Sequence, residues 1–419
     1  MRRYLVILAL LLTSCSSGAG DPGGSGSFTP PSGLPTGTIR VQAAGGEGEL
    51  NALEEMIEAF EAAHPGAKVE FTRLAEQSEH IAKLGTAFAG GSPPDVFLLN
   101  YRRFGRFAQQ GVIDPARLPG DPADYYPQTL EAFTLDGTLL CSPQNLSSSV
   151  VYYNTDLFEK ADVDLPKAGW TTDDLKKAAD AFAAKKVKSI GYETGMRTVA
   201  PFVWIFGGDV VDDLNKPTRI TLGTPEAREA LTYMKGLLDN GGVTATDAAA
   251  APAEDRFAQG ELAMLIDSRR AVPALRKAEG LSFDVAPMPK GTTEATLLAS
   301  DAYCVAKKAK NPELAHAFTR FAVGEVGGTV LAESGRTVPS LKSLAESPAF
   351  LAPDKAPKSS RVWLDIAPTV RRLPNVAAWN ETESTASDAL EQFFAGKQSL
   401  DATVAAIEKD SRRLLAAEG

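Results

Sequence analysis

Hydrogen-bonding side chains interrupt an apolar stretch near the middle of the chain. Residues 139–158 begin with apolar residues, change to a polar segment that holds Gln144 and Asn145, and resume as the apolar run from Val150 to Tyr153. Each amide side chain offers both donors and an acceptor, which suits recognition of a polar ligand. Two strands joined by a polar segment are typical of a chain that passes from one lobe to another. We therefore expect Gln144 and Asn145 to line a cleft rather than a core.

A cluster of aromatic residues offers a second kind of ligand contact. Residues 201–209 read PFVWIFGGD, and most of this run is expected in a hydrophobic core. Trp204 and Phe206 are nonetheless candidates for a stacking platform. A flat ring gives the apolar face of a ligand such as a sugar a large contact area, with little rotamer entropy to lose.

An aspartate follows a buried strand in the second half of the chain. Residues 263–266 are apolar and predict a strand, Asp267 comes directly after them, and residues 268–270 begin a helix. The Asp267 carboxylate can either cap that helix or face a ligand. The sequence leaves both roles open.

Motifs for catalysis and metal binding are not found in the sequence. It contains no GxSxG, no HExxH and no zinc-binding pair of cysteines, and His64, His80 and His316 lack ligand spacing. The glycine loop at residues 45–48 does not match GxGxxG, and no P-loop occurs. We therefore expect no enzyme, no metal and no cofactor. Paired carboxylates for glycoside hydrolysis stay open, because only their separation in space is informative.

The elements that must position these residues alternate between strand and helix. Residues 39–42, 68–71 and 95–99 predict strands, and the spacing of apolar residues predicts helices between them. Further along the chain, Thr171 and Thr224 are expected to cap helices, the second of which has a proline in its first turn. Such alternation predicts an α/β fold with a mostly parallel sheet covered on both faces. A chain of 419 residues is too long for one hydrophobic core and indicates two or three domain-sized units.

The composition narrows the class of partner. The hydrophobic share of 44% and the charged share of 23% are typical of a soluble globular protein. The net charge of -10, without a long basic run, argues against nucleic acid as a partner.

The N-terminus predicts export. Two arginines precede the apolar residues 5–12, a run too short to span a bilayer, so residues 1–14 are expected to form a signal peptide. The sequence LTSC at residues 12–15 resembles the bacterial lipobox, in which the cysteine receives a diacylglycerol and becomes the mature N-terminus. We expect a lipid anchor at Cys15, with an ordinary secretory signal and a chance cysteine as the alternative. Residues 15–38 are rich in Gly, Ser, Pro and Thr and predict a flexible tether.

Two cysteines remain after the anchor. Cys141 and Cys304 are the only other thiols of the chain. Because an exported domain meets an oxidising environment, we predict that they form a disulfide. Two independent buried thiols are the alternative.

Six short stretches, in a fixed order behind the lipobox, carry a family resemblance. The chain resembles family-1 extracellular solute-binding lipoproteins, the carbohydrate-binding components of ABC importers, which are related in fold to maltose-binding protein. The second stretch, VYYNTDLFEKA, is similar to the YYNKDLFEKAG common in that family. The six stretches are residues 93–96, 151–161, 257–264, 286–291, 310–315 and 335–339.

The resemblance implies a two-lobed periplasmic-binding-protein fold with three hinge crossings and a ligand cleft between the lobes. One lobe is expected from residues 39–140 with 302–338, and the other from residues 141–301 with 339–419. Ligand that contacts both lobes would favour a closed form. The expected partners are a carbohydrate, a membrane permease and a separate ATPase. We expect a monomer on the extracytoplasmic face of a bacterial membrane, held by its lipid anchor alone.

The resemblance also suggests which side chains bind the ligand, since acids, amides and arginines can each satisfy several hydroxyl groups. The expected ligand-binding residues are Glu47, Tyr101, Gln144, Asn145, Trp204, Phe206, Asp267, Arg269, Asp301 and Arg336. Where the family often has Gly and an aromatic ring after the buried strand, this chain has residues 267–270, DSRR, which suggests a more polar solute.

A non-sugar solute is the alternative ligand: ferric iron, a polyamine or an anionic compound. Tyrosine pairs at residues 125–126 and 152–153 invite the iron hypothesis, because phenolate oxygen is a hard ligand. Neighbouring side chains of a strand face opposite sides, however, so Tyr152 and Tyr153 cannot easily share a metal.

Overall fold

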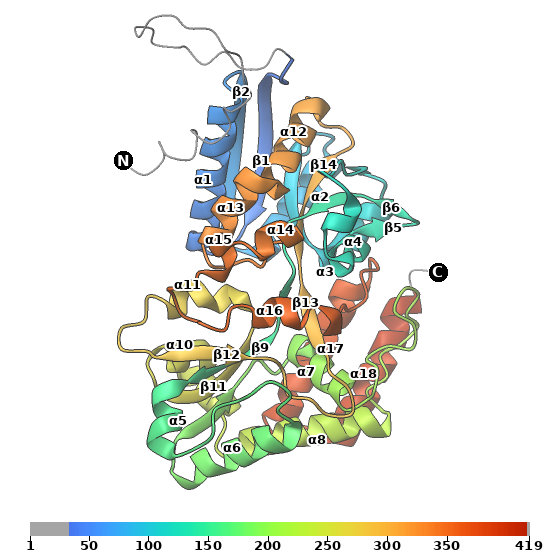
Figure 1. Cartoon of the computed structure of the whole chain (residues 1–419). Coiled ribbons are helices and arrows are strands. Elements are labelled where there is room, and N and C mark those ends of the chain that lie inside the picture. The colour runs from blue at the N-terminus through green and yellow to red at the C-terminus, as the bar shows by residue number, and fades with distance from the viewer. Residues whose placement is uncertain (1–32, 417–419) are drawn as a thin grey trace, which may run out of the picture. The chain divides into compact units, whose positions relative to one another are not determined.

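The computed structural model describes residues 33–416. From Pro35 onward the chain forms one compact unit built around two main sheets (Figure 1). The expected signal peptide, Cys15 and most of the expected tether lie outside the described residues. Within residues 33–416, no helix combines the length and the apolar character needed to cross a membrane.

The first sheet contains the N-terminal strands. Its order is β2 (Ala67–Leu74), β1 (Gly37–Ala44), β3 (Val96–Asn100), β14 (Asp301–Ala306) and β4 (Ile113–Asp114), with β7 (Cys141–Pro143) paired to β14. β1 runs parallel to β2 and β3, because α1 (Glu47–Ala63) and α2 (Gln77–Ala89) provide the crossovers. β14 is antiparallel to β3, so the prediction of a mostly parallel sheet fails where the chain returns.

The second sheet is also mixed. Its order is β10 (Lys188–Gly191), β11 (Leu262–Asp267), β9 (Val150–Asn154) and β12 (Phe283–Ala286). β10 and β11 are parallel, whereas β9 runs antiparallel to both of its neighbours.

The remaining helices surround these sheets and dominate the C-terminal part. Predicted caps are confirmed at Thr171, which forms a capping box with Asp174, and at Thr224, which precedes a first-turn proline. The helices are α3 (Tyr101–Gln109), α4 (Pro127–Ala132), α5 (Thr155–Ala161), α6 (Thr172–Ala184), α7 (Met196–Ile205), α8 (Pro225–Asp239), α9 (Ala245–Ala250), α10 (Ala253–Ala258), α11 (Val272–Leu275), α12 (Pro312–Val323), α13 (Glu325–Glu333), α14 (Lys342–Ala345), α15 (Pro348–Leu351), α16 (Val362–Asp365), α17 (Trp379–Phe394) and α18 (Leu400–Leu415).

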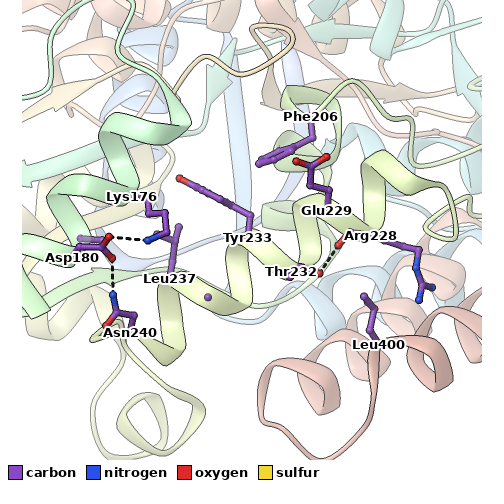
Figure 2. Close-up of a pocket in the computed structure, with 12 residues that line it drawn as sticks. Lys176, Asp180, Phe206, Arg228, Glu229, Thr232, Tyr233, Leu237, Asn240 and Leu400 are labelled. Atoms are coloured by element: carbon purple, nitrogen blue, oxygen red, sulfur yellow. Dashed lines mark hydrogen bonds and ion pairs between the residues drawn. The ribbon is translucent and has the colours of Figure 1, made fainter.

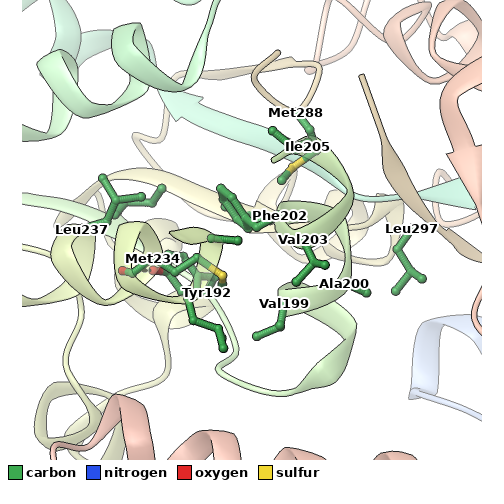
Figure 3. Packing of buried hydrophobic residues seen from close by; sticks show 14 of the residues in the cluster. Tyr192, Val199, Ala200, Phe202, Val203, Ile205, Met234, Leu237, Met288 and Leu297 are labelled. Carbon is green, nitrogen blue, oxygen red and sulfur yellow. Dashed lines mark hydrogen bonds between the residues drawn. The ribbon is translucent and has the colours of Figure 1, made fainter. Parts of the chain in front are cut away.

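Each sheet has an apolar cluster on both faces, as the alternating pattern predicts. One face of the first sheet packs against α1, α12 and α13, and its other face packs against α2 and α3. The largest cluster lies on the second sheet, where α7 and α8 bury side chains such as Phe202, Val203 and Met234 against each other (Figure 3). α10, α11 and α16 cover the opposite face of that sheet.

Three chain segments connect the sheets, which confirms the expected fold with three crossings. The first crossing runs through β7, β8 (Ser147–Ser148) and β9, and the second returns through β12, β13 (Thr296–Ala299) and β14. β13 pairs with β8 on one side and with β15 (Val370–Arg371) on the other. The third crossing comprises residues 335–339, where the Val338 carbonyl accepts a hydrogen bond of 2.7 Å from the Leu146 amide. The lobe boundaries predicted from the sequence stay a prediction.

A disulfide links Cys141 and Cys304, which confirms the predicted pairing over the alternative of two free thiols. The two residues face each other where β7 pairs with β14. The bond therefore ties the first crossing to the second on the first-sheet side, and it closes a loop of 163 residues.

We predict that replacing both cysteines by alanine lowers the free energy of unfolding by about 2–5 kcal/mol, because the unfolded chain regains the entropy of this long loop. Urea denaturation of the double variant, beside the wild-type protein with and without reductant, measures the effect. Equal midpoints for all three samples would show that the bond adds nothing to stability.

Candidate functional site

Polar side chains meet at the carboxyl ends of the first-sheet strands, where the crossings begin. Asn100 ends β3 and lies opposite Asp301, the first residue of β14. Asn100 Nδ2 donates to Asp301 Oδ1 at 3.1 Å, and the Asp301 amide donates to Asn145 Oδ1 at 2.7 Å. The pairing of β3 with β14 and the first crossing thus place three polar residues at one edge, where open α/β sheets bind ligands.

An ion pair joins α1 to the third crossing at the same edge. Glu49 Oε2 lies 2.7 Å from an Arg336 nitrogen. Burial raises the pKa of Glu49 to about 7, although the Arg336 charge lowers it; the Asp301 charge raises it further. A Cβ on Gly45 would lie 2.2 Å from Glu49 Oε2, so this glycine leaves room for the carboxylate. The glycine loop therefore accommodates a carboxylate that the sequence analysis did not single out.

A second ion pair joins α3 to α17. Arg102 pairs with Glu383, and its Nε donates to Asn100 Oδ1 at 3.2 Å. Trp379 Nε1 donates to the other Glu383 oxygen at 3.0 Å. A continuous hydrogen-bonded path therefore runs from Asp301 in the first sheet, through Asn100 and Arg102, to the C-terminal helix α17.

Arg197, in the first turn of α7, lies beside this path. Its pKa is lowered, first by burial and then by the Arg102 charge, while Glu193, Glu383 and Asp267 act in the opposite direction. Its side chain is nevertheless 41% exposed. Its Nε is buried and has no hydrogen-bond partner among the described residues. The Arg197 guanidinium is therefore partly buried by protein and partly accessible to water, as expected for a residue that lines a ligand cleft.

The second sheet contributes a charged group at the end of β11. Asp267 lies 2.6 Å from Arg270, and Arg270 also pairs with Glu254 at 3.0 Å and with Glu193 at 3.6 Å. Burial raises the pKa of Asp267 to about 6, against the lowering effect of Arg270. The Asp267 charge also raises the pKa of Arg197, so this second charged cluster, at the end of β11, lies near Arg197 and the charged cluster of the first sheet.

The structure brings part of the predicted set together. Asn145, Asp301 and Arg336 meet at the first-sheet edge, and Asp267 lies at the end of β11, near Arg197. Gln144 lies behind them, donating from Nε2 to the Tyr303 hydroxyl at 2.8 Å, and its Oε1 is buried without a partner among the described residues. Glu47 is exposed at the start of α1.

Three other predicted residues, Tyr101, Trp204 and Arg269, are buried in the core. Tyr101 is fully buried, and its hydroxyl accepts from the Leu373 amide at 3.1 Å. Trp204 is 2% exposed, and the Arg371 guanidinium lies over it, 4.7 Å from the centroid of the Trp204 ring.

Arg269 is fully buried, and its guanidinium donates to two backbone carbonyls and lies over two aromatic rings. Its neighbour Arg270 reaches the charged cluster instead, because adjacent residues of a helical turn point in different directions. Phe206 is half-buried and lines a separate hollow at the other end of α7.

Six residues of the two charged clusters were not predicted from the sequence: Glu49, Asn100, Arg102, Arg197, Arg270 and Glu383. A signal existed for Asn100, because a polar residue at the carboxyl end of a buried strand is a ligand candidate in an open α/β sheet. Glu49 and Glu383 lie inside ordinary amphipathic helices and carry no such local signal.

Comparison with known proteins places this geometry in context. Residues 55–358 match the family described as bacterial extracellular solute-binding protein. A binding protein of Brucella abortus strain 2308 is 28% identical over 370 residues, which cover 84% of this chain and 87% of the relative. The galactooligosaccharide-binding protein of Bacillus subtilis is 25% identical over 366 residues, covering 83% of this chain and 82% of the relative.

A solved structure is similar over nearly the whole chain. The ABC substrate-binding protein Lmo0181 of Listeria monocytogenes, in complex with cycloalternan, superposes with a TM-score of 0.81 at 25% identity. The match covers 91% of this chain and 99% of that protein.

The raised pKa of Glu49 predicts a pH dependence of stability. Because the folded-state pKa of about 7 lies above the ordinary value of 4.5, the folded protein binds a proton more tightly than the unfolded chain. The stabilisation is complete below the ordinary value and is lost as the pH rises through about 7. Replacing Glu49 by glutamine should remove this loss. Between acid and alkaline pH, the unfolding free energy of the variant should therefore rise, relative to that of the wild-type protein, by up to about 3 kcal/mol.

Urea denaturation at several pH values measures this difference. Glu47→Gln is the matched control, because it removes an exposed carboxylate from the same helical turn without touching the pair with Arg336. A Glu49→Gln profile parallel to that of wild type would contradict the assigned burial of this carboxylate.

Proposed function

The chain belongs to the family of bacterial extracellular solute-binding proteins, and from this premise we propose that it binds a carbohydrate for an ABC importer. The observation that carries the proposal is that charged side chains from both main sheets and from the crossings lie near the partly exposed guanidinium of Arg197. The proposed ligand cleft lies between the two charged clusters, which form its walls. A solute held there would contact both walls.

The chemistry of the walls supports a polyhydroxylated solute. Carboxylates and guanidinium groups are paired with each other at both walls, so donors and acceptors lie side by side. A hydroxyl group both donates and accepts, and charged partners form the stronger hydrogen bonds. A polyamine would instead be bound best by side chains that are mostly negative, and an anion by side chains that are mostly positive. The names of the similar proteins, which bind galactooligosaccharide and cycloalternan, add support.

The iron alternative finds less support in the tyrosine pairs. The Tyr152 hydroxyl is buried and donates to the Ser268 carbonyl at 2.8 Å, and the Tyr125 hydroxyl donates to the Pro119 carbonyl at 3.1 Å. Burial also raises the pKa of both phenols, which disfavours the phenolate that iron requires. These two rings pack in the protein interior, and their hydroxyl groups donate to backbone carbonyls.

The mechanism that fits this arrangement is closure of the two walls on the ligand. A solute that bridges them favours the closed form by the free energy of contacts that exist only there. A permease with a separate ATPase would read that form, since this chain has no nucleotide-binding motif. We assign this chain a binding role without catalysis, and we propose that it acts as a monomer.

A thermal-shift screen tests the proposal directly. Maltose, maltotriose, raffinose and galactooligosaccharides are offered to the protein without its signal peptide, and at least one should raise the unfolding temperature, because a ligand of the native state stabilises it. Arg197→Ala and Asp267→Asn should each weaken that ligand by about 1.5–3 kcal/mol in calorimetry, the scale of a charge-assisted hydrogen bond. Arg413→Ala, at an exposed position of α18, should bind as wild type does. Ferric iron binding without a response to any sugar would overturn the assignment.

We further propose that the protein is anchored through Cys15 on the outer face of the bacterial membrane. Two acyl chains hold a protein firmly, because each buried methylene adds about 0.8 kcal/mol of membrane affinity. In cells fed labelled palmitate, the wild-type protein should carry the label and sediment with membranes. Cys15→Ala should lose both properties, and a membrane-bound, unlabelled wild-type protein would contradict the anchor.

A further inference from the structure

A hollow lies away from the proposed cleft, and none of the charged residues assigned to the cleft lines it. It has a volume of about 650 Å³ and is bounded by α6, α8, the residue that follows α7, and the first residue of α18 (Figure 2). Volumes of this size hold small molecules in proteins. Arg197 lies near the start of α7 and Phe206 directly follows its end, so the hollow and the cleft are about 14 Å apart along the helix.

Two aromatic rings form one side of the hollow. The rings of Phe206 and Tyr233 lie 5.2 Å apart, and both are only half-buried. Among the contacting pairs of Phe, Tyr and Trp rings at residues 33–416, every other pair includes at least one buried residue, whereas both residues of this pair are more exposed. The Tyr233 hydroxyl donates to the Thr172 carbonyl at 2.6 Å, which fixes the ring in place. A fixed, partly open ring pair is a stacking surface for an apolar ring face.

Hydrogen-bonding groups surround these rings. Lys176 lies 2.7 Å from Asp180, and Asn240 donates to the same aspartate at 2.6 Å. Figure 2 shows the Glu229 carboxylate next to the Phe206 ring, and among the described contacts it has no ion-pair or hydrogen-bond partner. Arg228, at the other end, pairs with Asp401.

We propose that this hollow is a second carbohydrate-binding site, which takes a neutral pyranose unit independently of the cleft. The ring pair provides a platform for the C–H face of the sugar, the surrounding carboxylates accept hydrogen bonds from its hydroxyls, and the Asn240 amide can donate to them. Bases and acids occur side by side around the hollow, which favours an uncharged ligand over an ion. The volume of about 650 Å³ lies in the range of pockets that hold small ligands.

Fluorine NMR of the protein labelled with meta-fluorotyrosine tests the proposal, because Tyr233 reports on the hollow directly. The Tyr233 signal is assigned by its loss in Tyr233→Phe. Maltotriose, cellotriose and xylotriose are each added at millimolar concentration. At least one should shift the Tyr233 signal in a saturable manner, while the signal of Tyr126, a half-buried tyrosine outside the hollow, stays unchanged.

Two kinds of variant separate this site from the cleft. Arg197→Ala and Asp267→Asn should leave the Tyr233 titration intact, so the second site can be present even if the cleft binds no sugar. Phe206→Leu should raise the half-saturation concentration about tenfold, because it removes the stacking partner. Glu229→Gln, which keeps the shape of the hollow, should weaken binding less. An unchanged unfolding temperature shows that Phe206→Leu folds normally.

Three outcomes would overturn the proposal. They are no saturable shift of Tyr233 with any of the three sugars, a shift that disappears with the cleft variants, and a shift that Phe206→Leu leaves unaffected. The first would leave the hollow to a non-carbohydrate occupant, such as a segment of the permease.

Discussion

The structure depends on satisfying buried backbone groups where three chain segments cross between the sheets. The Gln144 amide donates to the Asp301 carbonyl at 2.8 Å, and the Gln144 carbonyl accepts from the Ser340 amide at 3.1 Å. Asn145 and Ser300 add a further bond, because the Ser300 hydroxyl donates to the Asn145 carbonyl at 2.6 Å. A buried amide or carbonyl without a partner costs about 1–3 kcal/mol, so these segments must lie side by side. The disulfide holds two of them together at the first-sheet end.

This requirement positions the charged walls. Asp301 and Arg336 extend from crossing segments whose backbones are already held in place, so their side chains need little further ordering to face a ligand. Desolvation is the cost of this arrangement, and it is visible in the raised pKa values of Glu49 and Asp267. Carboxylates that have already lost part of their water bind a hydroxyl with a smaller desolvation penalty than exposed ones.

Helix α7 connects the two proposed ligand sites. Its first turn holds Arg197, which we assign to the proposed cleft, its middle is buried in the largest apolar cluster, and the residue after its end, Phe206, lines the hollow. A close-packed interior transmits displacements rather than absorbing them. The buried middle of α7 is therefore a physical link between the cleft and the hollow.

The sequence by itself determined the α/β class, the six family stretches, the helix caps at Thr171 and Thr224, and the pairing of Cys141 with Cys304. These follow from local periodicity, from capping chemistry and from there being only two thiols beyond the anchor. Polar residues next to buried strands, such as Asn145, Asp267 and Asp301, were also recognisable, because strand ends converge at one edge of a sheet.

Only the tertiary structure decided which charges meet. Arg102 and Glu383 are 281 residues apart, and nothing local to either residue announces the partner. The same limit explains the errors at Tyr101, Trp204 and Arg269, whose types suit a ligand site but whose side chains point into a core. Residue type and spacing predict which elements form. The direction in which a side chain points depends on how those elements pack, and that depends on contacts between residues far apart in the chain.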